Sequence, residues 1–233
     1  MNRRFALAAL PLALVALTGA TRPAARSAAR PAARPMAAAP LGDTVRVAIR
    51  TELGTIVCDL DHAHAPKTVE NFVRYVDGRR LDGMTFYRAM HLAWGDQPNG
   101  LVQAGLRGDP RKVLKPVEHE PTSLTGLSHK AGTLSMARFA PGTATSDFSI
   151  LLSDMPGLDA TPSASDPSQQ AGFAVFGKVV EGMDVARKIW DAPRSPTKGE
   201  GVMKGQMLEP PVKVLSVRRV ALPVPAAVSL PQP

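Results

Sequence analysis

Two polar residues, Arg88 and Gln103, stand within short apolar runs that have the character of strands. Arginine is always charged and presents several N–H donors in a planar fork, so it can stabilise a lone pair that develops on a reacting atom. The same side chain is also common as a surface charge on a strand. Taken on its own, Arg88 is better interpreted as a surface charge than as a catalytic group. A catalytic role depends on the residues that lie beside it.

Other familiar chemistries have little support in the sequence. His62 and His64 form an H-x-H pair, but a metal site would need further ligands close in space, so we expect a solvated turn there. The segment Gly126-Leu-Ser-His-Lys130 lacks the second glycine of a nucleophile elbow, which argues against a hydrolase. The glycines of 199–205 have the wrong spacing for a nucleotide-binding loop. We expect no cofactor and no metal.

The elements that must position reactive residues are centred on Gly132–Leu152, with the sequence GTLSMARFAPGTATSDFSILL. Its two ends alternate between apolar and polar side chains, as strands with one buried face do. In the second run, Phe148 and Ile150 fall on one face, and Asp147 and Ser149 fall on the other. The connector between the runs is rich in turn formers. Two polar-faced strands beside an irregular loop are a common way to build a surface groove.

This region resembles the cyclophilin-type peptidyl-prolyl isomerases, in the runs GTLSMAR and SDFSILL on either side of a Pro-Gly loop. Three further runs are similar to the family and follow its order: FYRAM at 86–90, LVQAG at 101–105 and FAVFGKVVEGMD at 173–184. Upstream, the segment 54–78 is similar to the family's opening strand and helix. The resemblance covers roughly 45–220.

The resemblance implies roles for particular residues. Arg88 matches the family's catalytic arginine, which would hydrogen-bond the prolyl nitrogen when twisting makes that nitrogen pyramidal. Gln103 matches the glutamine that hydrogen-bonds the substrate backbone, and Leu101 falls at an apolar pocket position. Ala137 and Arg138 match the family's backbone-binding edge. With Gln103 and the SMAR run beside it, we favour the catalytic interpretation of Arg88 over a surface charge.

Departures from the family's pattern make the expected proline pocket more polar and shallower at one wall. Arg138 stands where Asn is usual, Asp147 where Gln is usual, and Ser149 where a large aromatic residue forms the pocket floor. Phe173 stands where His is common and offers a side chain to refill part of the pocket. Further departures are Gly100 in place of Phe and Gly157 in place of Trp. The expected substrate-binding residues are Leu101, Gln103, Ala137, Arg138, Asp147, Ser149, Leu158 and Phe173.

The amino-terminal residues have the order of a secretory signal peptide: a basic start, an apolar run over 5–17 and small residues up to Ala20. About 13 apolar residues fall short of the roughly 20 that a membrane span needs. Residues 21–42 predict an Ala/Pro/Arg-rich linker, because prolines interrupt any helix there. Residues 1–40 hold six Arg and no acidic residue, leaving 22 Lys and Arg against 20 Asp and Glu. A nearly neutral folded part gives little support to nucleic-acid binding.

The rest of the chain predicts one cyclophilin-like domain at 43–221 and a disordered tail at 222–233. Within the domain we expect a long surface loop with little structure over 153–171, a strand over 173–180 and a final strand over 212–220. Many short strands with two convincing helices, near 66–77 and 182–190, indicate an all-β (mainly β) architecture. The resemblance makes this a closed eight-stranded antiparallel cyclophilin-like barrel, capped by two α-helices. The single cysteine, Cys58, alternates in phase with apolar neighbours and is expected to be buried rather than reactive.

We therefore expect an exported peptidyl-prolyl cis-trans isomerase that acts on X–Pro bonds and assists the folding of exported proteins. Its location would be periplasmic or secreted once the signal peptide is removed. Its partners would be proline-containing polypeptides, with no nucleic acid and no stable membrane anchor, and the chain would be a monomer. The alternative is a non-catalytic peptide-binding or chaperone module on the same barrel. Arg88 favours the enzyme, and Ser149 favours the binding module.

Overall fold

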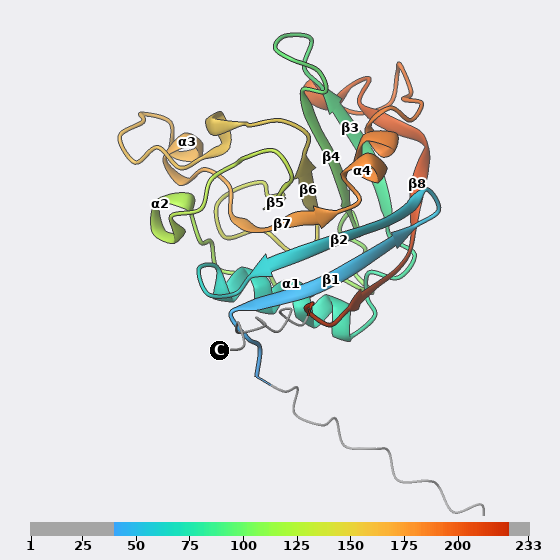
Figure 1. Ribbon diagram of the computed structural model, residues 1–233. Helices are drawn as coiled ribbons and strands as arrows, with labels where there is room; N and C mark the ends of the chain where they lie inside the picture. The colour runs from blue at the N-terminus through green and yellow to red at the C-terminus, as the bar shows by residue number, and fades with distance from the viewer. Residues whose placement is uncertain (1–39, 224–233) are drawn as a thin grey trace, which may run out of the picture. The chain divides into compact units, whose positions relative to one another are not determined.

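A closed barrel of eight antiparallel strands forms the body of the computed structural model, which describes residues 40–223 (Figure 1). The predicted signal peptide, most of the linker and most of the tail lie outside the described residues. Around the barrel the strands follow the order β1-β2-β7-β5-β6-β4-β3-β8, which confirms the expected fold class. The strands are β1 (Thr44–Thr51), β2 (Gly54–Asp61), β3 (Thr85–His91), β4 (Gly100–Gly105), β5 (Thr133–Met136), β6 (Phe148–Leu151), β7 (Val175–Glu181) and β8 (Met207–Arg219).

The hairpin of β1 and β2 forms because apolar residues alternate along both strands and meet in register. Val47 pairs with Cys58 and Ile49 pairs with Ile56, and all four side chains are fully buried. The turn between the strands needs a glycine at Gly54, which has a φ of +137°. A Cβ at this position would also lie 2.7 Å from the side chain of Val185. Burial raises the pKa of the Cys58 thiol, in agreement with an unreactive cysteine.

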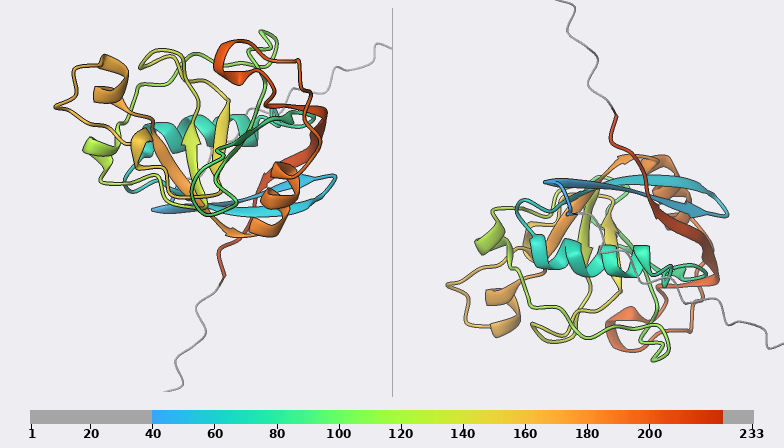
Figure 2. Two further views of the ribbon diagram at one scale, coloured as in Figure 1. Left: turned by 90° about the horizontal axis from the view of Figure 1, so that it is seen from above. Right: turned by 90° about the horizontal axis from the view of Figure 1, so that it is seen from below.

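Two helices, α1 (Pro66–Asp77) and α4 (Met183–Trp190), lie at opposite ends of β2. The first follows the end of β2, where the amide of Ala65 donates to the carbonyl of Asp61. The second follows Gly182, where a Cβ would meet Thr55 and Ile56 at the start of β2. Figure 2 shows α4 beside the hairpin of β1 and β2. Both helices bury one apolar stripe against the barrel, as their helical spacing predicts. Short helices α2 (Thr122–Thr125) and α3 (Pro167–Ala171) and the 3₁₀ turns η1 (Pro156–Leu158) and η2 (Gly201–Met203) lie in the connections.

Helix α1 has no side-chain cap of its own, because the residue before it is Ala65. The carboxylate of Glu120 supplies the cap from a distant loop. It accepts hydrogen bonds from the Thr68 amide at 2.8 Å, the Thr68 hydroxyl at 2.6 Å and the Lys67 amide at 3.2 Å. A negative charge at this position also favours the positive end of the helix dipole.

The barrel interior is centred on four phenylalanines. The Phe72 ring lies 5.3 Å from the rings of both Phe148 and Phe176, and the Phe86 ring lies 6.3 Å from that of Phe148. These residues come from α1, β6, β7 and β3, so one aromatic cluster ties the first helix to three strands. Phe148 is inside the barrel, as its strand phase predicts.

Two segments differ from the sequence-based expectation. Strand β8 begins at Met207 rather than near Val212, because pairing with β3 continues as far as Arg88 despite Pro210 and Pro211. The segment 153–171, expected as an unstructured surface loop, contains η1 and α3. The Asp166 side chain caps α3 by accepting from the Gln169 amide at 2.9 Å. Within residues 40–223, no helix has the length and apolar character to cross a membrane.

Candidate active site

The outer face of four neighbouring strands, β3, β4, β6 and β5, carries the polar residues of the candidate site. In the register of the sheet, Arg88 lies opposite Gln103, which in turn lies opposite Ser149. Ser149 lies opposite Ser135 on β5. Neighbours along the strands, such as Val102, face the core, so these four residues point outward. We call Arg88, Gln103, Ser149 and Ser135 the site row.

A β-bulge at Tyr87 places Arg88 on this face. Phe86 pairs with Ala104, while Arg88 pairs with Gln103, so Tyr87 is the extra residue. Without the bulge, strict alternation after the buried Phe86 would turn Arg88 toward the core. With it, Tyr87 and Arg88 are both outside the core cluster.

The guanidinium of Arg88 is held by two neutral side-chain amides. Its Nη1 donates to Oε1 of Gln103 at 2.9 Å, and its Nε donates to Oε1 of Gln206 at 2.8 Å. Within residues 40–223 the Nη2 group and one Nη1 hydrogen make no hydrogen bond, so they can donate to a substrate atom. Burial lowers the pKa of Arg88, but an arginine keeps its charge in proteins. A charged donor is therefore held on the outer face in a fixed orientation.

An apolar row lies beside the site row. Leu101 pairs with Met90 on one side and Leu151 on the other, so these three residues lie two positions along the strands from the site row, on the same outer face. Leu101 is buried but lies outside the core cluster of the barrel. The site thus combines a charged donor with an adjacent apolar surface, which suits a substrate that is apolar next to a polar reacting atom.

Asp147 is occupied by structural hydrogen bonds. Its Oδ1 accepts from the amides of Leu106 at 2.9 Å and Arg107 at 3.2 Å, and from the Ser146 hydroxyl at 2.8 Å. Its Oδ2 accepts from the Tyr87 hydroxyl at 2.9 Å. The carboxylate therefore fixes the chain after β4 and leaves only part of Oδ2 for a substrate, a narrower role than the sequence suggested.

Arg138 is folded back onto the segment before β7. Its Nε donates to the carbonyl of Gly172 at 3.0 Å, and its guanidinium lies 4.5 Å from the centre of the Phe173 ring. The amide of Phe173 in turn donates to the carbonyl of Leu158 at 2.9 Å. Arg138, Leu158 and Phe173 are thus brought together, and Phe173 precedes β7 instead of lying within it. Ala137, which is half-buried, is fixed by its amide, which donates to the Asp147 carbonyl at 2.8 Å.

Two contacts of the site have no local sequence pattern. Gln206 is 118 residues from Arg88 in the chain, so sequence spacing gives no indication of their hydrogen bond. The second contact is a chain of side chains, in which Ser135 Oγ lies 2.8 Å from His129 Nε2 and His129 Nδ1 lies 2.6 Å from Asp159 Oδ1. Ser135 is nearly inaccessible, in the middle of a strand paired on both sides, so we interpret the chain as a clamp on the Leu158–Asp159 segment.

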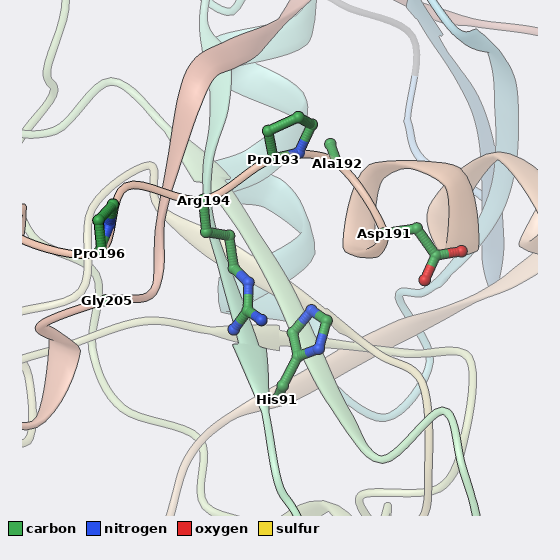
Figure 3. A pocket seen from close by; sticks show the side chains of 7 residues that line it. All are labelled: His91, Asp191, Ala192, Pro193, Arg194, Pro196 and Gly205. Carbon is green, nitrogen blue, oxygen red and sulfur yellow. The ribbon is translucent and has the colours of Figure 1, made fainter.

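Two cavities lie away from the site row. The first, of about 440 Å³, lies where the chain leaves α4, and its Arg194 side chain points toward the His91 ring (Figure 3). The second, of about 570 Å³, lies beside β2 and β7. Neither cavity includes Arg88 or Gln103. Among residues 40–223, no cluster of three or more His, Cys, Asp or Glu is arranged to hold a metal ion.

The strand order and the outward arginine define a closed β-barrel protein with a charged donor on its outer face. The family described as cyclophilin type peptidyl-prolyl cis-trans isomerase/CLD matches residues 46–219. The chain belongs to this family, whose members are isomerases of peptidyl-prolyl bonds.

Proteins of similar sequence are named peptidyl-prolyl cis-trans isomerases. A peptidyl-prolyl cis-trans isomerase of Acinetobacter baylyi is 35% identical over 78% of this chain and 88% of the relative. Peptidyl-prolyl cis-trans isomerase A of Dickeya dadantii is 37% identical over 63% of this chain and 71% of the relative. A solved cyclophilin type isomerase of Cryptosporidium parvum, at 18% identity, covers 77% of this chain and 99% of its own with a TM-score of 0.59, which supports the fold.

Proposed function

We propose that this isomerase uses Arg88 to accelerate rotation about X–Pro bonds in exported proteins and so assists their folding. The observation that carries the proposal is the guanidinium of Arg88, held by Gln103 and Gln206 with its remaining donors free. Leu101 provides the apolar surface beside it.

The chemistry requires no covalent intermediate. Resonance gives the X–Pro bond partial double-bond character, so uncatalysed rotation takes tens to hundreds of seconds. Twisting removes that resonance and leaves the prolyl nitrogen pyramidal, with a lone pair that accepts a hydrogen bond. A donor already fixed in place stabilises this twisted state more than either planar state, and that difference accelerates the reaction.

Substrate binding in this proposal uses the rest of the outer face. Gln103 accepts from Arg88 through Oε1, so its Nε2 hydrogens are the donors left for a substrate carbonyl. The segment of Ala137 and Arg138 offers a backbone edge, and Leu158 with Phe173 offers apolar contacts. Because Arg138 already donates to Gly172, we assign it to holding the Phe173 segment as well as to the substrate edge.

Export is part of the proposal and rests on the sequence. A basic start, an apolar run and small residues up to Ala20 have the order of a signal peptide, which would send the protein to the periplasm or outside the cell. The mature protein would act as a monomer on proline-containing polypeptides. It would have no membrane anchor, and the linker at 21–42 would be a spacer.

A non-catalytic binding module is the second candidate, and Ser149 is the observation that favours it. A serine in the site row, next to Gln103, gives a proline ring little apolar surface to rest on. Such a module would hold proline peptides without stabilising the twisted state.

A protease-coupled isomerisation assay over several X–Pro tetrapeptides separates the two candidates. We expect the wild-type protein to accelerate exchange in proportion to its concentration. Wild-type protein that binds the peptides, seen by calorimetry, but gives only the uncatalysed rate would overturn the enzyme and leave the binding module.

A further inference from the structure

Two aromatic side chains of the domain are strongly exposed. Trp94 is 69% exposed and Phe139 is 95% exposed, whereas the other aromatic residues among 40–223 are buried or half-buried. A lone exposed apolar residue is ordinary on a protein surface. The exposed aromatic residues here are notable for their places in the fold.

Both residues lie in connections that leave the four strands of the outer face, at opposite ends of those strands. Trp94 is in the β3–β4 connection, which leads into Leu101 and projects beyond the rim of the barrel (Figure 1). Phe139 is in the β5–β6 connection, which follows Ala137. The pairing of β4 with β6 puts Leu101 at the Trp94 end and Ala104 at the Phe139 end.

Each connection is fastened internally while its aromatic side chain stays in solvent. Asn99 donates through Nδ2 to the carbonyl of Trp94 at 2.5 Å and accepts through Oδ1 from the Ser153 hydroxyl at 2.6 Å. The amide of Phe139 donates to the Thr143 hydroxyl at 3.2 Å, and its carbonyl accepts from Arg138 at 3.1 Å. Because the backbone is already fixed, binding at these side chains costs little conformational entropy.

The site row between them lacks aromatic surface. Ser149 presents no ring to a proline, and neither does Gly100 at the start of β4, so much of the apolar contact with a substrate must come from outside the row. Strand β4 has six residues and spans roughly 17 Å, and both connections lie beyond its ends. A tetrapeptide is too short to reach both of them, whereas an extended chain of about ten residues is long enough.

We propose that Trp94 and Phe139 bind apolar side chains of an extended, unfolded polypeptide on the two sides of its proline. The inference rests on the proposed function, because the occupant is the same substrate chain that crosses the site row. It makes long apolar substrates the preferred class over short peptides.

The first test compares two peptides on the variants Trp94→Ser, Phe139→Ser and the double variant. One probe is the tetrapeptide Ala-Ala-Pro-Phe, and the other is a 15-residue peptide that carries the same Ala-Pro bond with leucines toward both ends. We expect each single variant to lower kcat/KM for the long peptide about three- to tenfold through KM, and to leave the tetrapeptide unchanged. Leu53 is an exposed apolar residue in the β1–β2 turn. The variant Leu53→Ser is therefore the matched control, and it should leave kcat/KM unchanged for both peptides.

A second test does not depend on activity. Trp190 is only 8% exposed, so collisional quenching by acrylamide reports mainly on Trp94. Saturating long peptide should protect Trp94 from quenching, and the tetrapeptide should not. The inference would be overturned if the long peptide left the quenching of Trp94 unchanged. It would also be overturned if the variants lost kcat/KM equally on the long peptide and the tetrapeptide. A wild type inactive on the tetrapeptide would instead overturn the proposed function, and the quenching result would then decide the aromatic sites alone.

Discussion

The guanidinium of Arg88 differs from those of three other arginines of the domain in its hydrogen-bond partners. Arg46, Arg218 and Arg219 are paired with the carboxylates of Asp59, Asp82 and Asp77. Arg88 is held by the neutral amides of Gln103 and Gln206, so its charge is oriented without being neutralised. In a half-buried position, an uncompensated charge interacts strongly with a lone pair that develops nearby.

Ser149→Phe should improve the enzyme. The substitution would add an aromatic surface beside Gln103, and about 1 kcal/mol of extra apolar contact corresponds to a gain of roughly fivefold in kcat/KM. Ser149→Ala is the control, since it removes the hydroxyl without adding surface, and should stay within about twofold of wild type. Tetrapeptide kinetics would check both. A folded Ser149→Phe protein with a raised KM would mean that Phe173 or Arg138 already fills that space.

The sequence predicts the key residues of the site better than their partners. Arg88, Leu101 and Gln103 stand in runs of strand character, and the family resemblance is enough to give each of them a role. The hydrogen bond from Arg88 to Gln206 and the clamp of His129 join segments that are remote in sequence. Such contacts exist only once the barrel closes, so no local spacing indicates them.

At the scale of elements, side chains from distant loops cap one helix of the barrel and hold a segment beside the site. Glu120 caps α1 from 52 residues away, and His129 holds Asp159 beside Leu158. The bulge in β3 is a further feature of this kind, because one extra residue in the strand turns the Arg88 side chain outward. The sequence predicts α1 from its apolar spacing and Pro66, but the cap and the bulge depend on tertiary pairing.

Glu120→Ala should destabilise the domain by roughly 1–3 kcal/mol, because the buried amide and hydroxyl of Thr68 lose their acceptor. Glu118→Ala is a matched control. Glu118 is exposed and only pairs with Lys67 on the surface, so its loss should cost under about 1 kcal/mol. The midpoints of urea unfolding measure both values. Equal midpoint shifts for the two variants would show that the cap contributes nothing beyond a surface charge.

His129 should make the domain less stable in mild acid. Burial lowers the pKa of His129 below its usual 6.5, although Asp159 opposes the change. Below pH 6.5 the unfolded chain takes up the proton first, so the free energy of unfolding falls as the pH falls toward the lowered pKa.

Urea titrations at a series of pH values from about 7.5 to 5.5 measure this loss on both sides of the usual histidine pKa. His129→Gln should have a shallower dependence than wild type. The same slope in the two proteins would be evidence against a buried neutral imidazole.

At the scale of the whole molecule, the chain combines a compact barrel with a basic amino-terminal segment. The total charge is +8, and the 40 residues before the domain carry six of the arginines and no acidic residue. Period-two alternation and two amphipathic helices predict the mainly β architecture, and the resemblance supplies the closure of the barrel. Strand β8 is longer than expected because pairing with β3 tolerates Pro210 and Pro211, which propensity alone disfavours.

Export predicts a mature protein that begins close after Ala20, since small residues there follow an apolar run of signal-peptide length. Amino-terminal sequencing of the protein from separated cell fractions checks this. Recovery of protein with an intact Met1 in the cytoplasmic fraction would remove the basis for exported clients while leaving the isomerase site untouched.

The most direct test of the central claim is the kcat/KM of Arg88→Ala and Arg88→Lys on a tetrapeptide whose exchange the wild type accelerates. One charge-assisted hydrogen bond to the twisted state is worth roughly 2–4 kcal/mol, so Arg88→Ala should lose about 30- to 1000-fold. Lysine lacks the planar fork that lets Gln103 and Gln206 fix the group, so it should restore little. Thermal unfolding should stay near that of wild type, because the side chain faces outward. An Arg88→Ala protein that is folded and keeps kcat/KM within about twofold of wild type would contradict the account.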